Sequence, residues 1–264
     1  MLCRICTTPS RTTAKAIILG KHTVQYFQCP TCGFVQTEEP YWLDEAYSTA
    51  ITKSDIGMAG RSVSSARITK AIIHSFFRGS GKFLDYGGGY GLMVRLLRDA
   101  GFDYYRNDKF CENIFAQGFD VDMPQEDKPP YELATAFEVF EHLVDPVQEV
   151  GQLLRFSRNV LLSTTLLPAL PPQPTDWWYY GIEHGQHVSL YTLKSLTLLA
   201  RRFELNCYSD GQSLHLLTEK RLSNAYFRFV ARHSTLLSLF FTVAQQRKSL
   251  LPSDFHALTG QALR

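Results

Sequence analysis

Short apolar runs alternate with amphipathic runs through the middle of the chain. The runs at residues 82–84, 133–137 and 160–162 are short and mostly apolar, which predicts buried strands. Between them, apolar residues recur every three or four positions and predict helices over residues 92–100 and 146–156. Strands that alternate with helices at this spacing predict a parallel, doubly wound α/β sheet.

Different elements flank this pattern on each side. A helix is predicted over residues 62–77, ahead of the first strand. After the last parallel strand comes a helix over 193–201. Two runs follow, 203–208 and 214–218, and the Ser-Asp-Gly-Gln between them predicts an antiparallel hairpin. Residues 221–264 predict further helices. The expected fold is a mostly parallel α/β sheet that ends in an antiparallel hairpin and is followed by C-terminal helices.

The first strand runs directly into the sequence Asp-Tyr-Gly-Gly-Gly-Tyr-Gly at residues 85–91. Glycine at Gly87, Gly89 and Gly91 allows positive φ and lets a ligand approach the backbone at a helix N-terminus, which indicates a nucleotide-binding turn. The dinucleotide fingerprint G-x-G-x-x-G fits neither reading frame. The acid Asp85 would repel a diphosphate but attract a ligand that carries an ammonium and a sulfonium group.

Two more acids follow strand ends and are candidate donor contacts. Asp108 comes after a predicted strand at 104–107 and lies 17 residues beyond Gly91, where a carboxylate can accept hydrogen bonds from ribose hydroxyls. Glu138 directly follows the strand at 133–137. We expect both acids at the ligand edge of the sheet.

Four of the six cysteines form two C-x-x-C pairs that are separated by 22 residues. Such spacing is typical of tetrahedral zinc, and redox pairs or disulfides are the alternatives. Apolar residues at 16–19 and 24–28 predict two strands of a zinc ribbon. Four thiolates leave no open coordination position, so we assign the metal a structural role. The predicted ligands are Cys3, Cys6, Cys29 and Cys32.

Candidate proton-transfer groups follow a proline-rich loop at 168–174. His184 and His187 are candidates for a general base, because imidazole titrates near neutral pH. Glu183 is a candidate orienting partner, and Tyr47 a candidate helper ahead of the sheet.

Composition narrows the class of protein. A formal net charge of +2 over 264 residues does not require a nucleic-acid partner, although it leaves one open. The N-terminus lacks the apolar run of a signal peptide, and no stretch reaches the roughly 20 apolar residues of a membrane span. We therefore expect a cytoplasmic protein, monomeric or homodimeric. The basic, amphipathic C-terminal helices would pack on the domain, on a second copy or on a membrane surface.

With these motifs in hand, residues 41–220 resemble class I S-adenosylmethionine-dependent methyltransferases, which have a Rossmann-like fold. The turn matches D-x-G-x-G-x-G, and residues 138–146 match E-x-x-E-H-x-x-D-P. The cysteine module and residues 187–192 are similar to bacterial methyltransferases of nucleotide-linked or polysaccharide sugars. This resemblance implies S-adenosylmethionine as donor and a sugar-nucleotide or glycan acceptor, methylated on a hydroxyl or a carbon. Gln186 stands where those relatives have Glu, which leaves O-methylation at least as favoured as C-methylation.

The resulting division is a zinc ribbon at 1–40, a helical cap at 41–78, a methyltransferase core at 79–220 and a helical extension at 221–264. Three alternatives stay open. The first two are an RNA acceptor and another small-molecule acceptor. Both follow from the Glu-x-x-Glu-His motif, which resembles the Mg²⁺ or Mn²⁺ site of small-RNA 2′-O-methyltransferases and of some quinone-pathway O-methyltransferases. The third alternative is a non-catalytic binding protein on a zinc-ribbon scaffold.

Overall fold

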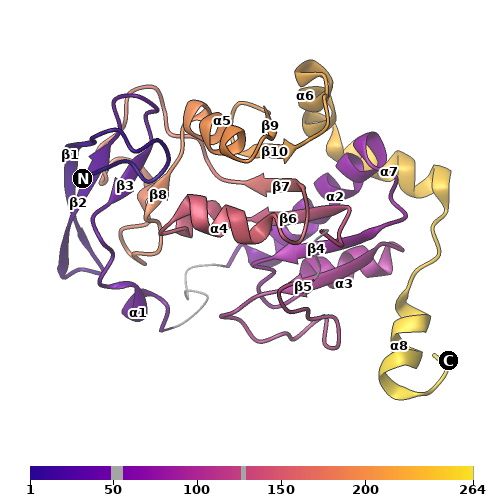
Figure 1. Cartoon of the computed structure of the whole chain (residues 1–264). Helices are drawn as coiled ribbons and strands as arrows, with labels where there is room; N and C mark the ends of the chain where they lie inside the picture. The colour runs from indigo at the N-terminus through magenta and orange to yellow at the C-terminus, as the bar shows by residue number, and fades with distance from the viewer. Residues whose placement is uncertain (49–55, 126–128, 264) are drawn as a thin grey trace. The chain divides into compact units, whose positions relative to one another are not determined.

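A computed structural model describes residues 1–48, 56–125 and 129–263 (Figure 1). Part of the predicted helical cap, residues 49–55, lies outside the described residues. The chain divides into two compact units, and each is described by itself. Unit 1 comprises Met1–Asp55, Glu138–Gln152 and Leu162–Arg221, and unit 2 comprises Ile56–Phe137, Leu153–Leu161 and Leu222–Arg264.

The larger of the two sheets has the strand order β5-β4-β6-β7-β10-β9. Its strands are β4 (Lys82–Tyr86), β5 (Asp103–Asn107), β6 (Leu133–Phe137), β7 (Asn159–Ser163), β9 (Asn206–Ser209) and β10 (Leu214–Thr218). Strand β4 pairs in parallel with β5 and β6, whereas β10 and β9 are antiparallel. The predicted α/β fold with a mostly parallel sheet and a terminal hairpin is confirmed.

Unit 2 surrounds β4 with aromatic and aliphatic side chains. Phe83 and Leu84 are fully buried, as expected for a strand covered on both faces. The ring of Phe83 stacks on Tyr104 with centroids 5.3 Å apart. The helices of this unit are α2 (Met58–Phe76), α3 (Leu92–Asp99), α6 (Asn224–Arg232), α7 (Ser234–Gln245) and α8 (Leu251–Thr259). Helix α2 packs against α3, α6 and α7.

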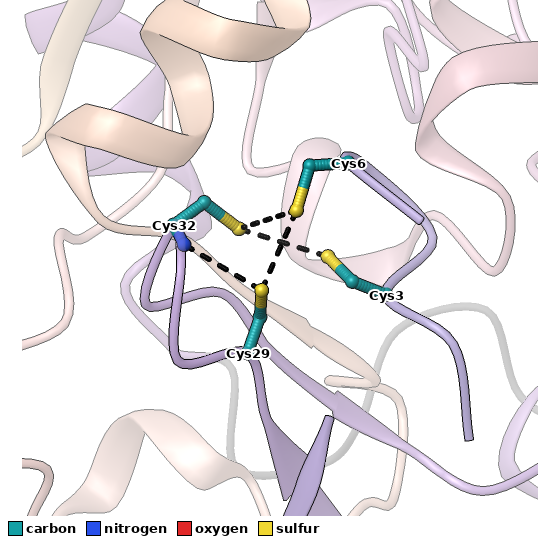
Figure 2. Close-up of side chains that lie close together, drawn as sticks. All are labelled: Cys3, Cys6, Cys29 and Cys32. Carbon is teal, nitrogen blue, oxygen red and sulfur yellow. Dashed lines mark hydrogen bonds between the residues drawn. The ribbon is translucent and has the colours of Figure 1, made fainter. Parts of the chain in front are cut away.

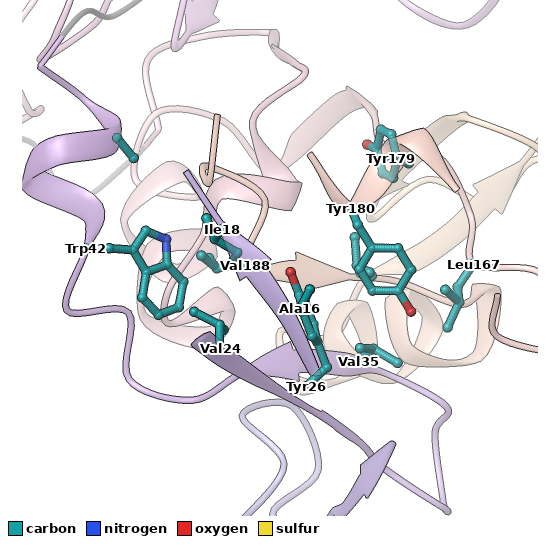
Figure 3. Packing of buried hydrophobic residues seen from close by; sticks show 12 residues of the cluster. Ala16, Ile18, Val24, Tyr26, Val35, Trp42, Leu167, Tyr179, Tyr180 and Val188 are labelled. Carbon is teal, nitrogen blue, oxygen red and sulfur yellow. The ribbon is translucent and has the colours of Figure 1, made fainter. Parts of the chain in front are cut away.

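Unit 1 contains a small antiparallel sheet of order β1-β2-β3-β8. Its strands are β1 (Arg11–Ile18), β2 (His22–Gln28), β3 (Val35–Thr37) and β8 (Ser189–Leu190). Beneath it, the indole of Trp42 shares one buried cluster with Val24, Tyr26, Tyr180 and Val188 (Figure 3). The predicted ribbon strands are therefore packed against residues that are distant in sequence.

The remaining elements of unit 1 are short helices. They are α1 (Leu43–Ala46), η1 (Phe140–His142), α4 (Pro146–Leu153), η2 (Trp178–Tyr180) and α5 (Leu193–Arg202). Helix α5 begins with a reciprocal capping box between Thr192 and Ser195. No helix among the described residues is both long and apolar enough to cross a membrane.

Several predicted boundaries are wrong. The first ribbon strand begins at Arg11 instead of residue 16, and the helix ahead of the sheet begins at Met58 instead of residue 62. The strand expected from residue 203 begins at Asn206, because residues 203–205 terminate α5: the Leu205 N–H donates to Ala200, and Glu204 has φ +61°. The helix expected to reach residue 156 ends at Leu153.

Candidate functional site

The glycine turn of unit 2 joins β4 to α3 with three left-handed residues. Gly87, Gly89 and Gly91 have φ of 68°, 54° and 83°. A Cβ on Gly91 would lie 2.6 Å from Asn113 Oδ1 and 3.2 Å from the Ala116 nitrogen, so close packing also requires glycine there. A Cβ on Gly89 would meet nothing within 4 Å. Gly89 is therefore a glycine of the turn with open space in front of it.

The side chains of Arg106, in β5, and of Asp108, which follows β5, hold Gly89 in place. Its N–H donates to Asp108 Oδ2 at 2.8 Å, and its carbonyl accepts from Arg106 Nε at 2.6 Å. The other oxygen of Asp108 accepts from the backbone N–H groups of Phe110 and Cys111, both at 2.8 Å. These bonds hold the carboxylate and the turn in one arrangement, and about one acceptor site, on Oδ2 of Asp108, is left for a further donor.

Asp85, at the end of β4, is a buried carboxyl group. Its Oδ1 accepts a hydrogen bond from Thr135 Oγ1 at 2.7 Å. Burial raises the pKa of Asp85 from its ordinary value to about 7, and the nearby charge of Asp108 adds to this increase, whereas Thr135 and Arg106 oppose it. A cationic ligand would favour the charged form of this carboxyl.

A second cluster lies in unit 1. One ligand atom each from Glu141, His142 and His187 lies within 4.8 Å of the others. The imidazoles of His142 and His187 are nearly perpendicular, with centroids 5.0 Å apart, and His184 approaches His187 to 4.8 Å. The structure thus brings His184 and His187 together with two residues of the Glu-x-x-Glu-His motif.

Hydrogen bonds orient two of these imidazoles. The Tyr179 carbonyl lies 2.7 Å from His187 Nδ1, so Nδ1 carries the proton and Nε2 keeps a lone pair. The Tyr47 hydroxyl lies 3.0 Å from His142 Nδ1. Burial lowers the pKa of His142 to about 4 and places the pKa of His187 well below its ordinary value. Both rings are therefore neutral at neutral pH.

Glu141 is the most unusual member of the cluster. It is completely buried, and neither carboxyl oxygen has a hydrogen-bond partner among the described residues. Burial, followed by the charge of Glu138, raises the pKa of Glu141 to about 8, whereas the nearby hydroxyl groups of Tyr179 and Thr164 lower it. A buried carboxyl without partners is costly. Two neutral imidazoles and an unpartnered carboxyl form a donor set that fits a divalent cation.

The backbone around the histidines is tied to residues near the N-terminus. Trp42 Nε1 donates to the Gly185 carbonyl at 2.8 Å, and Gln186 Nε2 donates to the Ala46 carbonyl at 2.8 Å. Gly181 has φ +58°, and a Cβ there would lie 2.4 Å from the His184 ring. The sequence analysis missed these tethers, because they join segments about 140 residues apart.

Two of the predicted site residues, Glu138 and Glu183, make none of the hydrogen bonds described above for the glycine turn and the histidine cluster. Glu138 has φ +53° and an exposed side chain, whose Oε1 accepts from Ser163 Oγ at 2.5 Å. Glu183 is exposed, and the hydrogen bond that orients His187 comes from the Tyr179 carbonyl instead. Tyr179, Thr135 and Arg106 were not predicted as site residues. The one available signal was the arginine that follows two tyrosines in strand β5.

The four predicted cysteine ligands converge from two loops of unit 1 (Figure 2). Sγ–Sγ distances are 3.6 Å for Cys3 and Cys32, 3.4 Å for Cys6 and Cys29, and 3.7 Å for Cys6 and Cys32. Disulfides would need about 2.05 Å. Thiolates around tetrahedral zinc at about 2.3 Å would be about 3.8 Å apart. Backbone N–H groups point to Cys3 and Cys29 Sγ, as is favourable for thiolates. The cluster fits one zinc ion.

Sequence comparison identifies a methyltransferase domain over residues 64–210. No curated protein matches the sequence. Among solved structures, a Burkholderia thailandensis 1,6-didemethyltoxoflavin N1-methyltransferase with bound S-adenosylhomocysteine is 13% identical, with a TM-score of 0.50, over 78% of this chain and 97% of that one. At this identity the match shows a shared fold.

Two further structures match less well. A possible histamine N-methyltransferase from Thermotoga maritima is 11% identical over 62% of this chain and 92% of that one, with a TM-score of 0.45. OxaC, in complex with sinefungin and meleagrin, is 15% identical over 53% of this chain, with a TM-score of 0.39. The chain spans only 43% of the length of OxaC.

Proposed function

This chain belongs to the methyltransferase domain family, and we propose that it transfers the methyl group of S-adenosylmethionine to a hydroxyl or carbon of a sugar nucleotide or glycan intermediate. The observation that carries the donor assignment is the turn at Gly89, which combines an open approach with two fixed acids. A protein of the same fold holds S-adenosylhomocysteine. The sugar acceptor rests on the resemblance carried by the cysteine module and by residues 187–192.

The donor residues have separate tasks in this proposal. Gly89 lets the ligand approach the backbone, and Asp108 accepts hydrogen bonds from the ribose hydroxyls. Asp85 supplies negative charge for the cationic part of the donor. Gly87 and Gly91 shape the turn, and Glu138, after β6, is an additional donor contact. S-adenosylmethionine supplies an electrophilic methyl group, so the protein needs only to position an acceptor and remove its proton.

We assign proton removal to the histidine cluster of unit 1. His187 is a neutral imidazole whose Nε2 lone pair is set by the hydrogen bond from Nδ1 to Tyr179. Its neighbour His184 is the second candidate base. Tyr47 orients His142 through its hydroxyl. Glu183, which is exposed, would contribute as a contact to the acceptor rather than by orienting His187.

A second mechanism is favoured by the unpartnered oxygens of Glu141. Glu141, His142 and His187 would hold a divalent cation, and Mn²⁺ suits two imidazoles better than Mg²⁺ does. When bound, the cation would acidify the acceptor hydroxyl. Glu141 would then be ionised and His187 would be a ligand instead of a base. The function is the same, but the role of His187 differs.

A donor-turnover screen tests the proposed function. The protein is incubated with S-adenosylmethionine and with sugar nucleotides, glycan intermediates or small RNAs, and S-adenosylhomocysteine is measured. We expect turnover with a sugar acceptor and its loss in His187→Asn. Turnover with RNA alone would refute the sugar acceptor. Failure of the protein to bind the donor in calorimetry would refute the enzyme assignment and favour a binding scaffold.

The two mechanisms are separated by metal binding. Mn²⁺ binding is measured by electron paramagnetic resonance on protein shown to retain its ribbon zinc. The cation mechanism predicts loss of binding in Glu141→Gln and retention in the matched control Glu39→Gln, an exposed carboxylate of unit 1. Turnover that is insensitive to a chelator, together with absence of Mn²⁺ binding, would favour the histidine base. If His184→Ala and His187→Ala both keep full activity, both mechanisms are wrong.

A further inference from the structure

Helix α7 of unit 2 has large apolar residues on its outer face, while two serines lie on the inner face beside the half-buried Leu237 and Phe241. Ser234 and Ser238 are buried, and the Ser238 hydroxyl has no hydrogen-bond partner in the described chain. In contrast, Leu236, Phe240 and Val243 are 68%, 64% and 74% exposed. A surface helix normally buries its apolar stripe and exposes its small polar residues. Water is therefore not the environment for which the outer face of α7 is suited.

The exposed apolar residues form one stripe. Leu236, Leu239, Phe240 and Val243 follow the helical spacing of three and four residues and lie on one face of α7. The preceding helix, α6, adds an exposed Phe229. Figure 1 shows α6 and α7 following each other in the C-terminal part of the chain. Scattered apolar residues need no explanation, but a continuous stripe indicates a contact surface.

The charges around the stripe have one sign. From residue 222 to the end of the sequence, the basic residues are Arg228, Arg232, Arg247, Lys248 and Arg264, and the one acid is Asp254. Asp254 is buried, and both of its carboxylate oxygens accept hydrogen bonds from the Arg98 guanidinium, at 2.7 and 2.8 Å. The exposed charged side chains of α6 and of the segment that follows α7 are therefore basic, namely Arg228, Arg232 and Lys248. Arg247 is half-buried and faces the carboxylate of Glu132.

We propose that α7 lies on an anionic lipid surface, with its apolar stripe in the headgroup and acyl boundary. Apolar residues flanked by basic ones are the composition of helices that bind in the plane of a membrane interface. Helix α7 has 12 residues and a length of about 18 Å, too short to cross the roughly 30 Å hydrocarbon core. It therefore lies on the surface and does not span it.

A second copy of the chain is the less favourable occupant. In a two-fold dimer the same patch meets itself, so the basic residues that flank it, such as Arg232 and Lys248, would face a surface that is also basic. An anionic lipid surface instead complements these charges. The proposal places the enzyme at a membrane, and it does not depend on the identity of the methyl donor or acceptor.

Vesicle flotation tests the proposal with the full chain. We expect binding to vesicles of equal parts phosphatidylcholine and phosphatidylglycerol, weaker binding to phosphatidylcholine alone, and loss of binding as salt is raised. The double variant Leu236→Glu/Phe240→Glu should lower the partition coefficient roughly tenfold or more, since two large apolar side chains are removed from the contact. Leu170→Glu, at another exposed leucine, is the matched control and should bind like the parent.

A second variant tests the charge. Arg232→Gln/Lys248→Gln should weaken binding to the anionic vesicles and leave the small affinity for neutral vesicles unchanged. Absence of vesicle binding by the parent protein would overturn the proposal, as would equal binding to neutral and anionic vesicles. Sedimentation of the parent as a dimer that Leu236→Glu/Phe240→Glu converts to monomers, without vesicle binding, would assign the stripe to a second copy instead.

Discussion

Replacing Asp85 by Asn tests whether its buried carboxyl binds the methyl donor. The carboxyl has a pKa raised to about 7 by burial. With this pKa, about 3% of the molecules carry the charge at about pH 5.5 and about half at about pH 7. If the donor requires the carboxylate, its affinity should rise roughly fifteenfold over this interval. The α-amino group of the donor stays protonated below about pH 7, so it does not confound the profile.

The assay is a calorimetric titration with S-adenosylmethionine at several pH values. The parent protein should bind more tightly as pH rises, and Asp85→Asn should bind weakly with a flat profile. Thr135 can still donate its hydroxyl hydrogen to the amide oxygen of Asn, so the variant keeps the local hydrogen bond. A flat profile in the parent protein, or an equal slope in the variant, would show that Asp85 does not carry the donor charge.

The free energy of unfolding should fall as pH rises, whereas the affinity for the donor should increase. A carboxyl whose folded pKa is raised binds its proton more tightly in the folded state, so the associated stability is lost as pH rises from about 4 to about 7. Between about pH 5.5 and about pH 8, the parent protein should lose on the order of 2 kcal/mol of unfolding free energy relative to Asp85→Asn. Urea unfolding at the two pH values measures the difference. Equal losses in both proteins would contradict the raised pKa.

Three further predictions concern other parts of the chain. Gly89→Val and the control Gly20→Val should each cost about 1–2 kcal/mol of stability, because both positions have positive φ, but only Gly89→Val should abolish donor binding in calorimetry. Elemental analysis should find one zinc ion per chain and much less in Cys32→Ser; reduced, metal-free thiols in the parent protein would exclude the zinc ribbon. Trp42→Phe should cost about 1–3 kcal/mol in urea unfolding, because the buried Gly185 carbonyl loses its partner; an unchanged midpoint would mean that water replaces the indole.

The elements that could be predicted are those with a local signal. Strand β6 begins and ends where its apolar run does, and α3 begins directly after the glycine turn. The turn itself was identified from the conformational freedom of glycine and from the acid that precedes it. Both signals act within a few residues, so no tertiary contact was needed to detect them.

The features that could not be predicted depend on contacts between distant segments. Strand β8 contains only Ser189 and Leu190, and it is a strand because these residues pair with Gln36 and Val35 of β3. No window of the sequence around residue 189 reveals this partner. The tether from Trp42 to Gly185 has the same origin. Positions 42 and 185 carry no pattern in common, so composition and periodicity contain no information about their contact.

The state of Glu141 shows what the structure adds to the motif that contains it. In sequence, Glu141 was one acid of the Glu-x-x-Glu-His motif, and its burial and hydrogen-bond partners could not be read from that motif. In the structure it lies among Thr164, Tyr179 and His187, and its two oxygens have no partner among the described residues. An unpaired buried polar group costs about 1–3 kcal/mol. This carboxyl does not stabilise the fold, since an apolar side chain of similar size would avoid the cost. A ligand that pairs with the carboxyl would remove this cost, and Glu141 together with the neutral His142 and His187 forms a donor set that a divalent cation would fit.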